Sequence, residues 1–256
     1  MRLAVQTFTV RRDARRNLPE TLARLKATGI EYLELARIKF SRENAETVAG
    51  SGLGTVAIQV TFNKLQRRFS QMVRFCRITG CSIVVVSVLP TAAILGFPGA
   101  LGFFARQLSL LARRYAAQGI RLAFHHHDFE FHKSRGSIKL ERLQKLCTPD
   151  VHFVMDTYWV ARSGFEPLAI AKMLGSRLLG LHLRDLEKPD SPAHGRDCAL
   201  GSGCINFEAL VKNLPDTVVY GAIEQNSSEP WESLRQSIAY CRKHSIGADN
   251  LESKEN

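Results

Sequence analysis

The sequence alternates short apolar runs with segments of helical periodicity, and the alternation repeats eight times. The apolar runs are rich in β-branched and aliphatic residues and are bounded by turn signals, which is typical of buried strands. Strands are predicted at residues 3–8, 32–36, 55–60, 82–88, 121–125, 152–156, 178–182 and 218–224. Helices are predicted at residues 18–28, 42–49, 65–79, 100–118, 139–147, 167–174, 207–213 and 231–244. Eight strand–helix units predict an α/β fold, a closed (β/α)8 TIM barrel of parallel strands with outer helices.

Signals at the helix ends agree with this scheme. Asn17 can cap the first helix and Gly29 can end it, and Gly80 and Gly119 can end later helices in the left-handed conformation. A doubly wound open sheet is the alternative, but it requires a glycine-rich phosphate turn after the first strand. Residues 7–16, TFTVRRDARR, contain no glycine. We therefore expect one barrel domain over residues 1–247, followed by a polar tail over residues 248–256.

Composition restricts the location and the partners. No apolar stretch approaches the roughly 20 residues that span a membrane, and the N-terminus lacks a signal-peptide pattern, so a cytoplasmic protein without a membrane partner is predicted. The net charge of +11 is compatible with binding to nucleic acid. However, the basic residues are spread over many predicted helices, where solvated faces explain most of them. We expect no nucleic-acid partner, while the sequence leaves a homo-oligomer open.

Four of the apolar runs end in a residue that can bind a divalent metal. Parallel strands of a barrel end at one rim, where catalytic groups collect. A carboxylate at the end of a buried strand is costly unless it is paired or bound to a metal. A lone histidine there is often a satisfied core residue, but four candidates at one rim support one another. They are His125, Asp156, His182 and Glu224.

The type of ligand restricts the metal. Carboxylate and imidazole groups without thiolate suit Mn²⁺, Zn²⁺, Co²⁺ or Mg²⁺, and two imidazoles favour Mn²⁺ or Zn²⁺. The fourth ligand stays open between three residues of the segment HHHDFE. His125 lies where the strand should end, and is preferred. His127 would then contact substrate or support the ligands, and Glu130 could bind the metal, bind substrate or serve as a base.

Other residues have weaker signals. Trp159 could stack on a sugar ring, although an aromatic residue after a strand is as often a packing residue. His194 and Arg196 lie in the long loop after the seventh strand and could bind hydroxyls, a carboxylate or a phosphate of the substrate. Asp185 could orient His182 or the neighbouring arginine. Three further residues end earlier strands and are expected to line the opposite half of the pocket: Gln6, Glu34 and Gln59.

The chain resembles the sugar phosphate isomerase/epimerase family with the xylose-isomerase-like barrel. The resemblance covers nearly the whole chain, through the segments AVQTFTVR, YLELA, HHHDFEF, DTYWVARSG, HLRD, LGSGCINF and IEQN. It implies a metal-dependent isomerase or epimerase for a sugar or keto-sugar, acting by proton transfer through a metal-stabilised enediolate. Members of the family bind one divalent metal through Glu, Asp, His and Glu. By position these correspond to His125, in place of the first Glu, and to Asp156, His182 and Glu224.

The histidine in place of glutamate affects the expected chemistry. Two carboxylates and two neutral imidazoles leave a divalent metal site near neutral, which makes the ion a stronger Lewis acid. Glu224 would face one side of the sugar, and the imidazole of His125 or His127 would face the other as the second proton-transfer group. A metal-dependent lyase or dehydratase acting on a keto-sugar or keto-inositol is therefore an alternative.

Two further alternatives remain. A non-catalytic barrel that binds a sugar is compatible with the altered ligand and with the missing histidine at the end of the third strand. An apurinic endonuclease-like nuclease of the same barrel class would need a histidine three residues after Asp156, where this sequence has Trp159. The nuclease is therefore the less favoured of the two.

Overall fold

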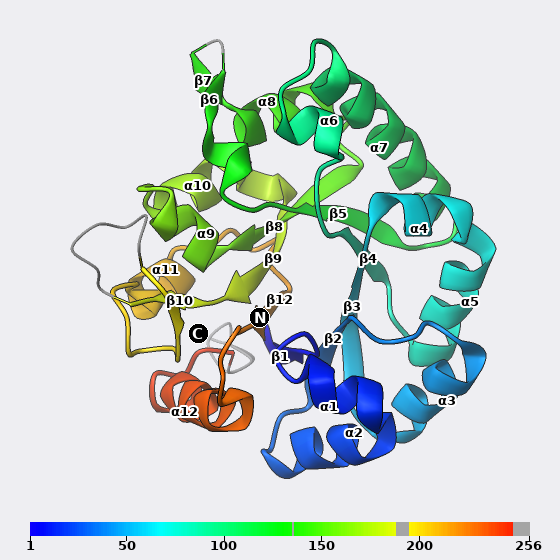
Figure 1. Ribbon diagram of the computed structural model, residues 1–256, viewed down its shortest axis with the longest axis vertical. Coiled ribbons are helices and arrows are strands. Elements are labelled where there is room, and N and C mark those ends of the chain that lie inside the picture. Colours follow the sequence, from blue (N-terminus) through cyan, green and yellow to red (C-terminus); the bar gives the residue numbers. More distant parts are fainter. Residues whose placement is uncertain (135, 188–194, 248–256) are drawn as a thin grey trace, which may run out of the picture.

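The computed structural model describes residues 1–134, 136–187 and 195–247. Eight parallel strands close into a barrel, which confirms the predicted fold (Figure 1). Barrel strands that follow one another in the sequence are also neighbours in the ring, and the first strand closes the ring by pairing with the last. The barrel strands are β1 (Arg2–Gln6), β2 (Tyr32–Ala36), β3 (Gly54–Val60), β4 (Ile83–Val86), β5 (Arg121–His125), β8 (Val151–Asp156), β9 (Leu178–Leu183) and β12 (Tyr220–Ile223).

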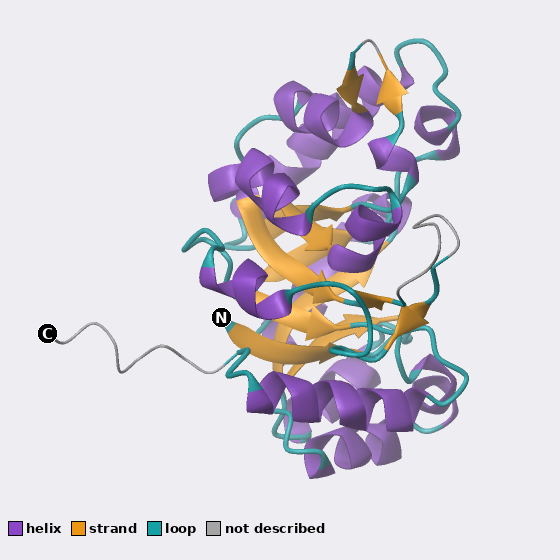
Figure 2. Cartoon of the chain, turned by 90° about the vertical axis from the view of Figure 1, so that its left-hand side faces the viewer, coloured by secondary structure: helices purple, strands orange, loops and turns teal. Residues whose placement is uncertain are grey.

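Helices surround the barrel on its outer side (Figure 2). Each of the eight predicted helical segments contains a helix, and the predicted cap and glycine stops are present: the Asn17 side chain accepts a bond from the Glu20 N–H, and Gly29, Gly80 and Gly119 have positive φ. The helices are α1 (Arg11–Arg16), α2 (Leu18–Ala27), α3 (Arg42–Gly50), α4 (Phe62–Arg67), α5 (Phe69–Thr79), α6 (Thr91–Ile94), α7 (Ala100–Ala116), α8 (Lys139–Leu146), α9 (Thr157–Arg162), α10 (Pro167–Leu174), α11 (Phe207–Lys212) and α12 (Pro230–Lys243).

Some local features differ from the prediction. The single helix expected over residues 65–79 is two helices, because Arg68 leaves the helical region with φ −110° and ψ 30°. Short elements also occupy predicted loops. They are the helices α1, α6 and α9, the 3₁₀ turns η1 (Phe129–Phe131) and η2 (Gly175–Arg177), the hairpin of β6 (Lys133–Ser134) with β7 (Ser137–Ile138), and the hairpin of β10 (Asp185–Leu186) with β11 (Asp197–Cys198). Within the described residues, no helix has the length and apolar character needed to cross a bilayer.

The core has two layers, and the inner one sets the direction of the rim residues. A small apolar cluster fills the barrel, and it includes Ala123 on β5 and Val154 on β8. Side chains two positions apart on a strand point to the same face. His125 and Asp156 lie two residues beyond these core residues, so they point into the mouth of the barrel. The other apolar cluster packs between strands and helices.

Candidate metal centre

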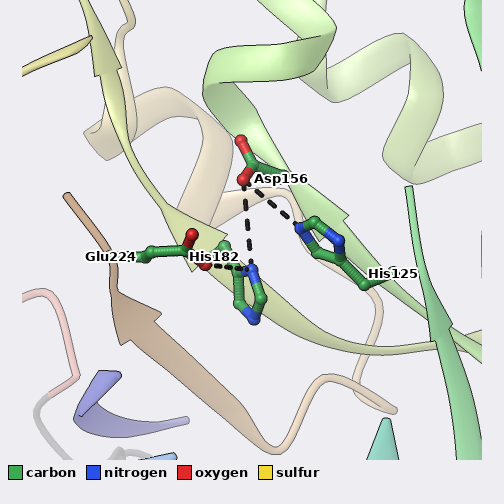
Figure 3. Close-up of side chains that lie close together, drawn as sticks. All are labelled: His125, Asp156, His182 and Glu224. Atoms are coloured by element: carbon green, nitrogen blue, oxygen red, sulfur yellow. Dashed lines mark hydrogen bonds and ion pairs between the residues drawn. The ribbon is translucent and has the colours of Figure 1, made fainter. Parts of the chain in front are cut away.

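Four rim residues from four barrel strands form one buried cluster. His125, Asp156, His182 and Glu224 each offer a ligand atom, and these atoms all lie within 4.8 Å of one another (Figure 3). The four residues are at most 6% exposed. Strands β5, β8, β9 and β12 are consecutive neighbours in the barrel. Parallel pairing thus brings together residues up to 99 positions apart in the sequence, from 125 to 224.

Asp156 uses both carboxylate oxygens. Oδ1 caps α9 by accepting a bond of 3.1 Å from the Trp159 backbone N–H. Oδ2 faces the cluster, 3.4 Å from Nε2 of His125 and 3.2 Å from the guanidinium of Arg184. Burial by itself would raise the pKa of Asp156, but the nearby Arg184 and His125 outweigh it and hold the pKa below its usual range. The residue is therefore a fixed anion.

On the side away from the rim cluster, the ring of His182 contacts two side chains from the opposite half of the barrel. Its Nε2 lies 3.0 Å from Oε1 of Glu34 and 3.1 Å from the amide nitrogen of Gln6. The Gln6 amide also donates to Glu34, at 3.2 Å. All three side chains are fully buried. An N–H of His182 directed at Glu34 leaves Nδ1 facing the rim cluster, which is how a carboxylate fixes the orientation of a metal-binding histidine.

On the side that faces the rim cluster, His182 makes an incomplete contact with Glu224. Nδ1 of His182 and Oε2 of Glu224 are 2.8 Å apart, but neither atom has a hydrogen bond of acceptable geometry. Burial lowers the pKa of His182, whereas Glu34 and Glu224 raise it more, to about 10; the same contact lowers the pKa of Glu224 to about 2. Buried polar atoms left without a partner are costly. A cation bound between them would satisfy both, so the residues fit a divalent metal.

His125 can be fixed in the tautomer that binds a metal. Its Nδ1 lies 3.4 Å from the carbonyl oxygen of Ser87, and its Nε2 faces Asp156. A proton on Nδ1, directed at this carbonyl, leaves the lone pair of Nε2 for a cation. The next histidine points elsewhere: Nε2 of His126 accepts the backbone N–H of Asp156 at 3.2 Å. His126 thus positions the strand that carries Asp156.

Arg184 adds a positive charge beside the cluster. Its guanidinium lies 3.2 Å from Asp156 and 3.6 Å from Glu224, and a closer contact of 2.6 Å joins it to Asp197. Burial disfavours the charged form of Arg184, but the three carboxylates more than offset this and raise its pKa. The guanidinium therefore shares two carboxylates with the candidate metal. The sequence pointed to Arg184 only as the neighbouring arginine that Asp185 could orient.

A cavity of about 400 Å³ opens over the cluster. His127 and Trp159 line it on the side of β5 and β8, and their rings lie 5.6 Å apart. Burial and the neighbouring His125 lower the pKa of His127 to about 3, so its imidazole is neutral. Nδ1 of His127 is buried without a hydrogen-bond partner. Both residues thus stand where a molecule over the rim cluster would lie.

Two predicted residues make other contacts. Glu130 is fully buried, and its carboxylate accepts the backbone N–H of His127 at 2.8 Å, so it holds the turn after β5 and does not line the cavity. Asp185 accepts four backbone N–H groups, those of residues 186, 201, 203 and 205. It therefore fixes the loop that precedes α11. The orienting role expected of Asp185 toward His182 is taken by Glu34, from the opposite half of the barrel.

The long loop after β9 is only partly described. His194 and the tail over residues 248–256 lie outside the described residues. Arg196 is exposed, its carbonyl accepts the N–H of Glu187 in the β10–β11 hairpin, and its side chain is not part of the cavity lining. Of the residues that end earlier strands, Gln59 lines the cavity, while Gln6 and Glu34 reach His182. In the sequence, Glu34 is recognisable as the charged residue within the apolar run YLELA.

The fold and the rim cluster define a (β/α)8 barrel protein with a donor set of the kind that binds a divalent cation. The family model described as xylose isomerase-like TIM barrel matches residues 11–244, and the chain belongs to this family. One curated relative is the rhizopine catabolism protein MocC of Rhizobium meliloti, with 27% identity over 127 residues. That match covers 44% of this chain and only 38% of the relative.

Solved structures share the fold over nearly the whole chain. A sugar phosphate isomerase/epimerase from Parabacteroides distasonis ATCC 8503 matches with a TM-score of 0.79 and 18% identity, covering 96% of this chain and 95% of that one. AsbF from Bacillus anthracis, described as a probable 3-DHS dehydratase, matches with a TM-score of 0.75 and 13% identity, covering 94% and 99%. The IOLI protein with a bound zinc atom matches with a TM-score of 0.71 and 15% identity, covering 96% and 97%. These neighbours share the fold of the xylose isomerase-like barrel that the family model identifies.

Proposed function

We propose that the protein is a metal-dependent isomerase or epimerase that moves a proton on a sugar or keto-sugar. The observation that carries the proposal is the buried cluster of His125, Asp156, His182 and Glu224 beneath a cavity large enough for a monosaccharide. The unsatisfied atoms of His182 and Glu224 face each other in it. Such a cluster is costly to maintain without a cation.

The four residues would hold one divalent cation, Mn²⁺ or Zn²⁺ by ligand type, with Mg²⁺ or Co²⁺ as weaker alternatives. When bound, the cation would polarise a carbonyl and an adjacent hydroxyl of the substrate. The zinc atom described for IOLI shows that a protein of the same fold can bind a metal, which supports this proposal. The family membership supports a small-molecule sugar or polyol as the substrate.

The geometry supports the following roles for the residues around the substrate. Glu224 lines the cavity; its Oε2 faces His182 and the candidate cation site, so Oε1, 3.6 Å from Arg184, is the oxygen that can accept a proton from a substrate carbon. Asp156 is less suited to this role, because both of its oxygens are engaged. On the other side, the imidazoles of His127 and His125 are the candidates for the second proton-transfer group, although the low pKa of His127 makes its imidazole a weak base. Trp159 lies in the cavity wall, where its ring can pack against the sugar.

Metal analysis followed by isotope exchange tests this proposal. The purified protein is expected to bind about one equivalent of Mn²⁺ or Zn²⁺ and, when loaded, to incorporate solvent deuterium into a keto-sugar from a panel of candidates. Asp156→Ala and Glu224→Ala should lose the metal and the exchange, whereas Asp216→Ala, at an exposed site in the loop before β12, should keep both. Unchanged metal content in the first two variants would overturn the proposal.

A lyase or dehydratase is the second candidate. An imidazole, His125, faces the cluster where a second carboxylate base would stand, so a single carboxylate, Glu224, is available to remove a carbon-bound proton. One base suffices for elimination of water, since the leaving hydroxyl departs from the neighbouring carbon. The fold of AsbF is compatible with this reaction. Mass spectrometry of the product distinguishes the two, because a dehydratase product has lost water and an isomer has not.

A further inference from the structure

The cavity is asymmetric in charge. The metal-ligand candidates lie on β5, β8, β9 and β12, and the opposite wall is formed by residues that follow β1, β2, β3 and β4. Two cations stand in that opposite wall, Arg37 directly after β2 and Lys64 in α4. Glu224 is the one acidic residue in the lining, and it belongs to the metal cluster.

Each cation is placed against an aromatic residue of the same wall. The guanidinium of Arg37 lies 6.0 Å from the ring centroid of Phe8, and the ammonium of Lys64 lies 4.8 Å from that of Phe40. Such rings hold a cation without neutralising it. Within residues 1–134, 136–187 and 195–247, neither cation forms an ion pair with a carboxylate. Their charges therefore remain available at the cavity.

The backbone at Arg37 is held in an unfavourable conformation. Arg37 has φ of 58°, which a non-glycine residue adopts at a cost. The preceding residue is fixed by the hydroxyl of Thr7, which accepts the Ala36 N–H at 2.8 Å and donates to the Ala36 carbonyl. Nε of Arg15 donates to the Arg37 carbonyl at 3.2 Å. A strained residue that its neighbours hold in place at a cavity wall is a feature of binding sites.

Further cations gather behind this wall. Arg11 is bonded to Asn226, a residue of the cavity lining, at 2.6 Å. Burial lowers the pKa of Arg11, and the charges of Arg12, Arg37 and Arg15 lower it further, whereas the charge of Glu224 raises it. Like charges held close together without a counter-ion destabilise the folded state. An anion bound at the mouth would relieve this repulsion.

We propose that the substrate carries an acidic group, a phosphate or a carboxylate, which Arg37 and Lys64 bind at the wall opposite the metal cluster. The inference rests on the proposed function, because the acidic group is part of the molecule whose carbonyl lies over the rim. Gln59 lies on the same side of the cavity, and its Oε1 is buried without a partner. It can accept a hydrogen bond from a sugar hydroxyl between the two ends of the substrate.

Binding of matched ligands to the Mn²⁺-loaded full chain tests the proposal. Calorimetric titration compares D-fructose with its 6-phosphate and with 2-keto-D-gluconate, so that the two acidic groups are separate arms. At least one charged ligand should bind about tenfold or more tightly than fructose, and its affinity should fall as salt is added. Equal affinities, or binding of none of the three, would overturn the proposal.

Variants connect the preference to these two cations. Arg37→Asn combined with Lys64→Gln should reduce the affinity for the charged ligand to that for fructose while the metal content stays the same; asparagine tolerates positive φ. Arg106→Gln with Lys172→Gln removes the same charge from exposed helix positions and should keep the preference. A preference that survives the first pair contradicts the proposal. So does tighter binding of a DNA duplex than of any charged sugar, since the wall would then serve a polymer.

These results are distinguishable from failure of the proposed function. If the unmodified protein neither bound metal nor catalysed deuterium exchange, the isomerase proposal would be contradicted. Metal binding and exchange with neutral keto-sugars, without any preference for charged ones, would contradict only the acidic-group proposal.

Discussion

Oε1 of Glu34 on β2 lies 3.0 Å from Nε2 of His182 on β9, although β1 and β12 separate these strands in the ring. The contact crosses the interior of the barrel and directs Nδ1 of His182 at Asp156 and Glu224. Glu34 would therefore act on the metal through the orientation of His182, without binding the metal itself.

Replacing Glu34 by glutamine tests this relationship. Glu34→Gln keeps the shape but weakens the hold on His182, and the metal affinity should fall about 10- to 100-fold, as for other residues that support metal ligands. Competition with a chelator measures the affinity. Glu31→Gln, at an exposed position before the same strand, is the control. An unchanged affinity in Glu34→Gln would show that the contact only packs the barrel.

Arg184 is expected to stabilise the metal-free protein. Arg184→Met removes a 5%-exposed cation and leaves the carboxylates of Asp156, Glu224 and Asp197 without it. The loss of one partner from a buried ion pair costs about 3–5 kcal/mol. Urea unfolding without metal should show this loss, and added Mn²⁺ should recover more stability in the variant than in the unmodified protein. Equal stabilisation of both by Mn²⁺ contradicts a metal at this site.

His125→Glu should make the folded protein more dependent on metal. The new carboxylate would face Oδ2 of Asp156, which now lies 3.4 Å from the imidazole Nε2. Without a cation, two carboxylates at this distance repel each other, whereas a bound divalent ion gains a third negative ligand. Thermal unfolding with and without Mn²⁺ should show a larger metal-induced shift than in the unmodified protein. His125→Gln is the neutral control, and an equal shift in both variants would argue against His125 as a ligand.

The buried carboxyl group of Glu130 is expected to make the stability of the protein depend on pH. Burial raises its pKa from 4.5 to about 8, against the opposing bonds from the backbone. The folded protein therefore holds this proton in a range where the unfolded chain releases it, and stability contributed by Glu130 is lost as the pH rises from 4.5 towards 8. Glu130→Gln should be close to the unmodified protein at pH 5 and more stable by about 2–4 kcal/mol at pH 8. Urea unfolding at both values measures this, and parallel pH profiles would contradict it.

Much of the fold was predictable because strand and helix periods are local properties. The runs of β-branched residues and the helix stops at Gly29, Gly80 and Gly119 identified all eight units. The interruption at Arg68 was not predictable, since the residues on both sides of it have good helical periodicity.

The sequence by itself determined which residues stand at the rim. A ligand-type side chain at the end of an apolar run stands at the rim of a parallel barrel, and it points into the mouth when the residue two positions before it fills the barrel interior, since the strand period is two. Only the tertiary structure decided how these residues are paired. Glu34 reaches His182, Asp185 binds a loop, and Arg184 shares the carboxylates of the metal cluster, because contacts across a closed barrel depend on register and closure, which leave no local pattern in the chain.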